Sequence, residues 1–120
     1  MAPERQIIAV TADSGELVAT EWLEKAECVH RQLRPQLPAE YTRRMSKVFC
    51  DGARMAVVVE AGRVLCVIVW RLIENTYEGR RLYVDDLITD ESVRSSGVGK
   101  LMLDWLAAKA ASLDCDVLAL

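Results

Sequence analysis

Residues 94–99, with the sequence R-S-S-G-V-G, combine glycines and positive charge in a way that could bind a phosphate group. Gly97 and Gly99 come just before a run of helix-forming residues, and Arg94 and Lys100 place a positive charge at either end. The first backbone N–H groups of a helix lack partners within the helix, and the helix dipole is positive there. Because glycine has no side chain, a phosphate can approach these groups closely. The stretch therefore predicts an anion site at a helix N-terminus.

Two common phosphate motifs are excluded by single residues. A Walker A loop requires a glycine where this chain has Arg94, and a serine or threonine where it has Leu101. A dinucleotide-binding turn requires a third glycine at the position of Met102. What is left is an R-x-x-G-x-G loop, which is neither a nucleotide P-loop nor a dinucleotide turn.

A loop of this kind needs a strand before it and a helix after it, so the surrounding elements matter. Alternating and β-branched apolar residues predict strands, whereas apolar residues three or four apart predict helices. Asp13 and Glu16 have the spacing of a capping box and predict the start of the first helix. In chain order, the patterns predict a strand at 5–12, a helix carrying Val18 and Trp22, a helix after Pro38, strands at 55–60, 64–77 and 81–89, a helix after Gly99 and a short buried strand at 115–120.

This order predicts an α/β fold with the succession β-α-α-β-β-β-α-β, in a single domain spanning 1–120. Short glycine turns join the three central strands, which indicates a three-stranded antiparallel meander. The strand before the loop, the helix after it and the last strand form a βαβ unit, so those two strands are expected to be parallel. The long strand at 64–77 is expected to contain a bulge near Glu74 and Asn75.

The bulk composition limits the kinds of partner and site. Of the 120 residues, 52% are hydrophobic, and the net charge of −3 argues against a nucleic-acid partner. The chain begins without a signal-peptide pattern, and apolar runs such as 64–70 are too short to cross a bilayer, so a cytoplasmic protein without a membrane partner is expected. The four cysteines lack metal-ligand spacing, so buried thiols and no metal are expected. The single histidine, His30, is expected to be structural, at the surface or half-buried.

Residues 82–106, an acidic apolar strand followed by the glycine loop and an amphipathic helix, resemble the central motif of the GCN5-related N-acetyltransferase (GNAT) superfamily. That family carries Q/R-x-x-G-x-G/A after its fourth strand, and the order of the upstream elements is also similar over nearly the whole chain. The resemblance implies a GNAT-like mixed central sheet. It also implies an acyltransferase that uses acetyl-CoA as co-substrate and, as acceptor, a primary amine of a small or amino-acid-like molecule.

The resemblance also implies which residues bind the coenzyme. The loop is implied to wrap the pyrophosphate with the backbone N–H groups of Arg94, Ser95, Ser96, Gly97, Val98 and Gly99, and Lys100 adds a positive charge beside it. The strand end is implied to splay from the last strand, so that the pantetheine arm pairs with Leu87, Ile88 and Thr89. A backbone N–H group there is implied to stabilise the oxyanion of the thioester carbonyl. Ser95 stands where the family usually has glycine, and the two serine hydroxyls are expected to add phosphate contacts.

Two adjacent carboxylates on the strand before the loop match the paired acids of many family members. The attacking amine must be neutral, and a carboxylate or a water chain usually takes its proton. Asp85 and Asp86 are therefore the catalytic candidates, with Glu74 on the adjacent strand in reserve. Neighbours on a strand point to opposite faces, so at most one of the pair is expected to face the acetyl group, and Asp85 is favoured. The alternative is that these acids only bind a cationic substrate or cap the strand.

The chain differs from the family at its end. The family continues past the position of Leu120 with a helix and two strands, and a tyrosine from there often protonates the leaving thiolate, a role that neither Tyr77 nor Tyr83 matches. The domain is therefore expected to be C-terminally incomplete, with an open apolar edge at 115–120 that favours a homo-oligomer, most simply a dimer. Two other functions stay open, a non-catalytic acyl-CoA-binding or regulatory module and a fragment that oligomerises through this edge.

Overall fold

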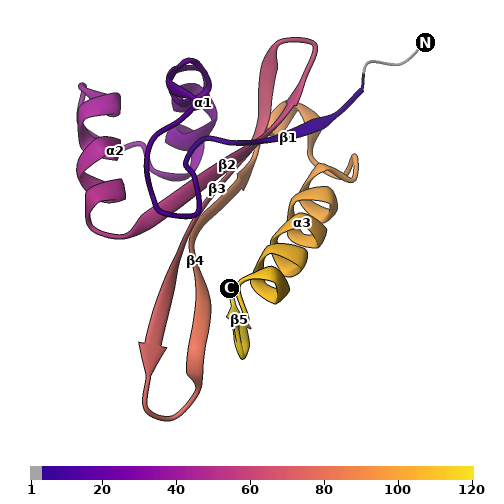
Figure 1. The fold of residues 1–120 in the computed structure, drawn as a ribbon. Helices are drawn as coiled ribbons and strands as arrows, with labels where there is room; N and C mark the ends of the chain where they lie inside the picture. The colour runs from indigo at the N-terminus through magenta and orange to yellow at the C-terminus, as the bar shows by residue number, and fades with distance from the viewer. Residues whose placement is uncertain (1–3) are drawn as a thin grey trace.

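A computed structural model describes residues 4–120, so the first three residues of the expected domain lie outside it. The chain forms one five-stranded sheet in the order β1-β2-β3-β4-β5, with α1 and α2 on one face and α3 on the other (Figure 1). The expected α/β fold and its order of elements are confirmed. Within 4–120, no helix is long and apolar enough to span a membrane. The elements are β1 (Gln6–Ala9), α1 (Thr20–Leu33), α2 (Tyr41–Cys50), β2 (Ala53–Glu60), β3 (Arg63–Asn75), β4 (Gly79–Thr89), the short 3-10 helix η1 (Glu91–Val93), α3 (Val98–Ser112) and β5 (Val117–Ala119).

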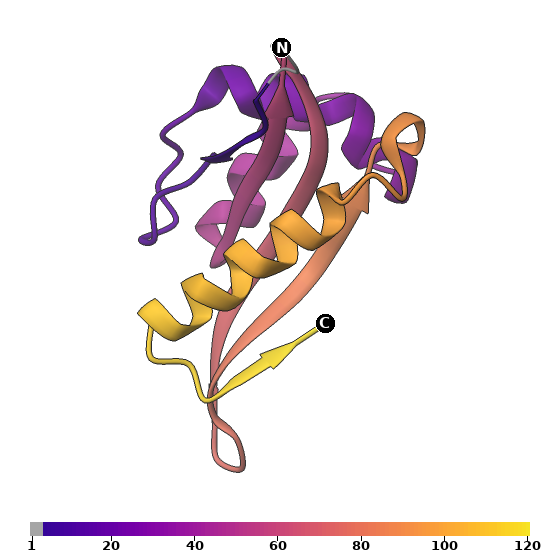
Figure 2. The ribbon, with the colours of Figure 1, turned by 90° about the vertical axis from the view of Figure 1, so that its right-hand side faces the viewer.

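The strand pairing leaves part of one edge of β4 open. β2, β3 and β4 are antiparallel neighbours, and β5 lies parallel to β4 after the crossover through α3. The pairing between β4 and β5 covers three positions, from Arg81 with Val117 to Tyr83 with Ala119. Figure 2 shows β5 beside the lower part of β4. Among residues 4–120, no strand pairs with the outer edge of β4 beyond Tyr83, so its backbone groups there can pair with a ligand.

The middle strands β2 and β3 are buried on both faces of the sheet, which explains why their sequences are almost continuously apolar. Val57 and Val67 belong to the core beneath α1 and α2. Ile68 and Trp70 belong to a second core beneath α3. The sheet therefore separates two hydrophobic layers, and the hairpin of β3 and β4 extends beyond both as a long arm (Figure 1).

The segment at Asp13–Glu16 is a tight turn and does not start a helix, so the capping-box prediction is wrong. The N–H group of Ala12 donates to the carbonyl of Glu16 at 2.8 Å, and Thr11 pairs with Leu17 in an antiparallel bridge. Gly15 adopts a φ of +93°, which glycine tolerates and which closes the turn. The first helix starts later, at Thr20, after the bridge between Thr11 and Leu17 that follows this turn.

The cysteines are less buried than expected. Cys66 in the centre of β3 is fully buried, and burial raises the pKa of its thiol to about 11. Cys115 is half-buried, whereas Cys28 and Cys50 are exposed on the outer surfaces of α1 and α2. The expectation of four buried thiols is therefore correct for Cys66 and wrong for the two helical cysteines, which lie off the apolar stripes of their helices.

Candidate active site

A β-bulge in β4 brings Asp85 and Asp86 to the same face of the sheet. Asp86 pairs with Val69 of β3 and Val84 pairs with Trp70, so that Asp85 is an extra residue without a partner. Two residues on the bulged strand then oppose one on its neighbour, and the alternation of side chains is interrupted. The premise that these neighbours point to opposite faces therefore does not hold here, and the expectation that at most one of them faces the acetyl group stays a prediction. The prediction of a bulge near Glu74 and Asn75 is wrong, because these two residues pair regularly with Arg80 and Gly79, and the register shifts between Val69 and Trp70 instead.

Asp86 is held by two side chains of α1. The imidazole Nε2 of His30 lies 2.7 Å from one carboxylate oxygen, and Arg34 contacts the other through Nε at 2.9 Å and Nη2 at 2.7 Å. Burial, the strongest single influence, acts to raise the pKa of Asp86, but the bonds from His30 and Arg34 together hold this pKa below its usual range. Asp86 is therefore ionised, with both oxygens occupied, and is poorly suited to accept a further proton.

Replacing Asp86 with asparagine is expected to weaken the dependence of stability on acidic pH. Because the pKa is lowered in the folded state, the ionised carboxylate stabilises the fold above the ordinary value of 3.8, and this contribution is lost as the pH falls through the lowered pKa. Urea unfolding at about pH 6 and about pH 3 measures the loss for the wild type and for Asp86→Asn. An equal loss in both proteins would contradict the assignment.

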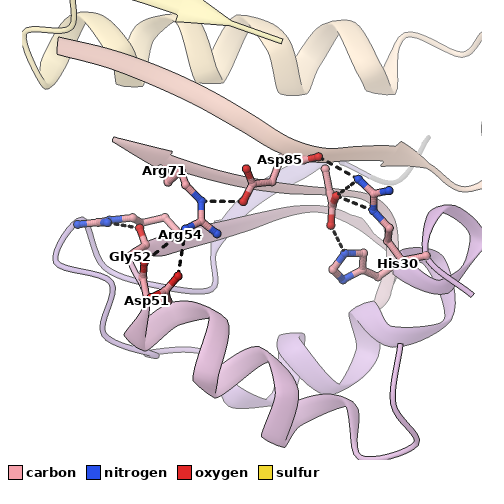
Figure 3. A network of polar contacts seen from close by, with 8 residues as sticks. His30, Asp51, Gly52, Arg54, Arg71 and Asp85 are labelled. Atoms are coloured by element: carbon pink, nitrogen blue, oxygen red, sulfur yellow. Dashed lines mark hydrogen bonds and ion pairs between the residues drawn. The ribbon is translucent and has the colours of Figure 1, made fainter. Parts of the chain in front are cut away.

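Asp85 has a different environment from its neighbour. One of its carboxylate oxygens accepts a 2.7 Å hydrogen bond from Nε of Arg71, which also approaches Asp51 at the end of α2 (Figure 3). Its other oxygen has no partner within residues 4–120, and about a quarter of the side chain is exposed, at 27%. Asp85 is thus the member of the pair with an oxygen available to a ligand.

The structure does not bring Glu74 to these carboxylates. Glu74 lies on the arm formed by β3 and β4, where it pairs with Arg80 across the hairpin and its side chain is 72% exposed. Arg80 and Asp85 are five positions apart on β4, a distance of roughly 15 Å along the strand. A reserve role for Glu74 therefore has no geometric support, because its carboxylate is too far from the bulge to reach the same substrate atom.

The loop after β4 presents an uncapped helix N-terminus. Gly97 occupies the N-cap position of α3 with a φ of +90°, and no side chain caps the first backbone N–H groups. A Cβ atom added to Gly97 would meet nothing within 4 Å, whereas one on Gly99 would lie 3.6 Å from the hydroxyl of Thr89. The loop from Arg94 to Gly97 is exposed. The open N–H groups and the missing side chain fit a bound phosphate.

Distant side chains hold the loop in this shape. Arg5 donates to the carbonyl of Ser96 at 2.9 Å, and Arg63 donates to both Asp90 and Ser92 at 2.8 Å. Ser95 adopts a φ of +65°, a conformation that costs a non-glycine residue of the order of 1 kcal/mol. Arg5, just before β1, and Arg63 on β3 therefore maintain a conformation that the loop sequence alone would not favour.

The two cations of the loop differ in availability. Arg94 is exposed, and its guanidinium makes one long contact, at 3.5 Å, to the carbonyl of Thr89. Lys100 is paired with Asp104 one turn along α3, at 2.8 Å. Of the two, Arg94 is the cation better placed to contact an anion at the start of the helix.

Sequence reasoning missed the side chains that surround the two aspartates. His30 and Arg34 on α1, and Arg71 on β3, are the groups that hold Asp85 and Asp86. His30 is also fully buried, at 1% exposure, so the expectation of a surface or half-buried residue is wrong. Within residues 4–120, no three histidine, cysteine, aspartate or glutamate side chains gather as a metal site would need.

Several solved structures share the fold of this chain. A ribosomal-protein-alanine N-acetyltransferase from Brucella melitensis biovar Abortus matches 97% of this chain and 78% of its own, with a TM-score of 0.76 at 15% identity. An aminoglycoside N-acetyltransferase in complex with CoA matches 99% and 77%, with a TM-score of 0.80 at 14% identity. An acetyltransferase from Trypanosoma brucei matches 96% and 80%, with a TM-score of 0.71 at 17% identity. At these identities the likeness establishes the fold.

Comparison with sequence families identifies the family of the chain. None of the curated proteins compared matches the chain. The family model described as the acetyltransferase (GNAT) family matches residues 22–120, a span that begins in the first turn of α1 and includes α2, the bulged strand β4, the glycine loop and α3. The chain therefore belongs to the acetyltransferase (GNAT) family and is an acyltransferase.

Proposed function

We propose that the chain transfers an acetyl group from acetyl-CoA to the primary amine of a small or amino-acid-like molecule. The observation that carries this proposal is the placement of the uncapped N-terminus of α3 at the end of a strand whose outer edge is open. A pyrophosphate at Gly97 would leave the rest of the coenzyme lying along β4 beside the bulge. Asp85 lies on that bulge with a free carboxylate oxygen.

Each part of this site has a distinct task in acetyl transfer. The N–H groups at the start of α3 and the guanidinium of Arg94 bind the pyrophosphate. The open edge of β4 at Leu87, Ile88 and Thr89 offers backbone partners to the pantetheine arm. Asp85 takes the proton of the amine as the nitrogen attacks the thioester carbonyl, and the C–S bond then breaks to release CoA as its thiolate. A solved relative bound to CoA supports the choice of co-substrate.

Two measurements on the purified chain test the proposal. Calorimetric titration with CoA should show saturable binding, and acetyl-CoA with a panel of primary amines should release free thiol in an amine-dependent way. The panel should include amino acids, a polyamine and an aminoglycoside, because the acceptor is the least constrained part of the proposal. Binding without turnover on any amine would favour the acyl-CoA-binding module, and absence of binding would reject both functions.

A further inference from the structure

His30 is a buried titratable group to which the proposed chemistry gives no task. It lies on the inner face of α1 at 1% exposure, and both of its ring nitrogens have partners. Nδ1 lies 2.7 Å from the hydroxyl of Tyr41, the first residue of α2, and Nε2 lies 2.7 Å from the carboxylate of Asp86. The three side chains therefore form a continuous chain from α2 through α1 to the bulge of β4.

The chemistry of the two end groups determines where the hydrogens lie. Asp86 is ionised and can only accept, so Nε2 of His30 must carry the hydrogen that it donates. Tyr41 is 2% exposed, and burial is the main cause that raises the pKa of its phenol, so its hydroxyl stays protonated and donates to Nδ1. A neutral imidazole with one hydrogen on Nε2 satisfies all three groups.

This assignment of the hydrogens leaves Asp86 without a role in a proton relay. In this tautomer both hydrogen bonds run toward the carboxylate, from Tyr41 to His30 and from His30 to Asp86, so Nε2 has no lone pair with which to receive a proton from Asp86. The other carboxylate oxygen is occupied by Arg34. The hydrogen bonds from Tyr41 to His30 and from His30 to Asp86 therefore orient the carboxylate of Asp86 and do not prepare it to exchange protons.

The bulge is the feature that needs such support. Asp85 has no partner in the strand ladder, and an unpaired extra residue is free to change its local conformation. Arg34 contacts both residues of the bulge, since its Nη2 lies 2.7 Å from the Asp86 carboxylate and donates to the carbonyl of Asp85 at 3.3 Å. His30 contacts the same carboxylate from the other side, so the orientation of Asp86 is coupled through Arg34 to the backbone that carries Asp85.

We propose that His30 is a positioning residue for acetyl transfer, which holds Asp86 so that the bulge presents the free oxygen of Asp85 to the acceptor amine. The inference rests on the proposed function, because it assigns His30 to the geometry of that reaction. It divides the tasks of the adjacent carboxylates, with Asp86 as the anchor and Asp85 as the group that meets the substrate. Tyr41 has the supporting task of keeping the hydrogen of His30 on Nε2.

Two matched variants separate this role from simple core packing. The amide nitrogen of glutamine reaches the position of the histidine Nε2, so His30→Gln retains a donor to Asp86. The amide of asparagine reaches only the position of Nδ1, so His30→Asn retains the contact with Tyr41 and loses the bond to Asp86. We expect His30→Asn to lower kcat by about ten- to 100-fold and His30→Gln by at most about threefold, with the affinity for CoA unchanged in both. Equal losses in the two variants, or a matching loss of CoA affinity, would overturn the proposal.

The tautomer of His30 gives a test on the unmodified protein that needs no turnover. Nitrogen-15 spectra of the imidazole should show a neutral ring with its hydrogen on Nε2 and a hydrogen-bonded, unprotonated Nδ1. A hydrogen on Nδ1, or on both nitrogens, would overturn the proposal, because the donor chain toward Asp86 would be broken or charged. Absence of turnover in the wild type would reject the proposed function alone, since the spectra still decide whether His30 donates to Asp86.

Discussion

Replacing Gly97 with valine is expected to weaken CoA binding by about 100-fold or more, which corresponds to about 2.8 kcal/mol. Gly97 is the N-cap of α3 with a φ of +90°, a region that costs a β-branched residue conformational energy. A side chain there points into space that the structure leaves open and that the pyrophosphate would occupy. Calorimetric titration of the variant with CoA measures the effect directly.

Gly52→Val is the matched control for the backbone strain of that substitution. Gly52 has a φ of +108°, and a Cβ atom added there also meets nothing within 4 Å, but it joins α2 to β2 and lies outside the glycine loop. Both variants should lose a similar amount of folding stability, about 1–2 kcal/mol, while only Gly97→Val should lose CoA. Retention of tight CoA binding by Gly97→Val would show that the coenzyme does not approach this helix N-terminus.

The location of this loop could be predicted because its physics is local. An uncapped helix start with glycine depends on neighbouring residues, and the positions of Gly97 and Gly99 within one turn are enough to indicate it. The hydrogen bonds from Arg5 and Arg63 to this region could not be predicted, because the two arginines lie far from the loop in the sequence. Asp13 and Glu16 show that a local pattern can also mislead. Their spacing predicts the start of a helix, but these residues form the turn that Gly15 closes.

The arrangement of the two carboxylates could be predicted from the sequence only in part. The presence of two adjacent acids is plain in the sequence, but the shared face of Asp85 and Asp86 results from a bulge that depends on the register with β3. Strand periodicity assigns neighbours to opposite faces, so a single extra residue reverses the conclusion. The role of His30 was inaccessible for a similar reason, because its partner on β4 lies 56 residues further along the chain.

Replacing Asp85 with asparagine is expected to lower kcat by about 10²- to 10⁴-fold, the range that a general base contributes. The substitution keeps the size and the hydrogen-bonding shape of the side chain but removes its ability to take a proton. Asparagine can still accept from Arg71, so the ion-pair partner is not left without a hydrogen bond. The binding of CoA should be unchanged, because the pyrophosphate loop lies beyond the end of β4. Steady-state kinetics with a saturating amine, beside a CoA titration, measures both quantities.

Glu78→Gln is a closely matched control, because Glu78 also belongs to a half-buried carboxylate–arginine pair, with Arg81 at 3.1 Å. Its side chain is 28% exposed, against 27% for Asp85, and it lies on the arm away from the bulge. A loss of activity confined to Asp85→Asn therefore reports proton transfer, since the loss of an arginine ion pair is common to both variants. Equal activity of Asp85→Asn and the wild type would exclude Asp85 as the base. Ordered water would then have to deprotonate the acceptor amine. Both carboxylate oxygens of Asp86 are occupied by His30 and Arg34, and the carboxylate of Glu74 is too far away.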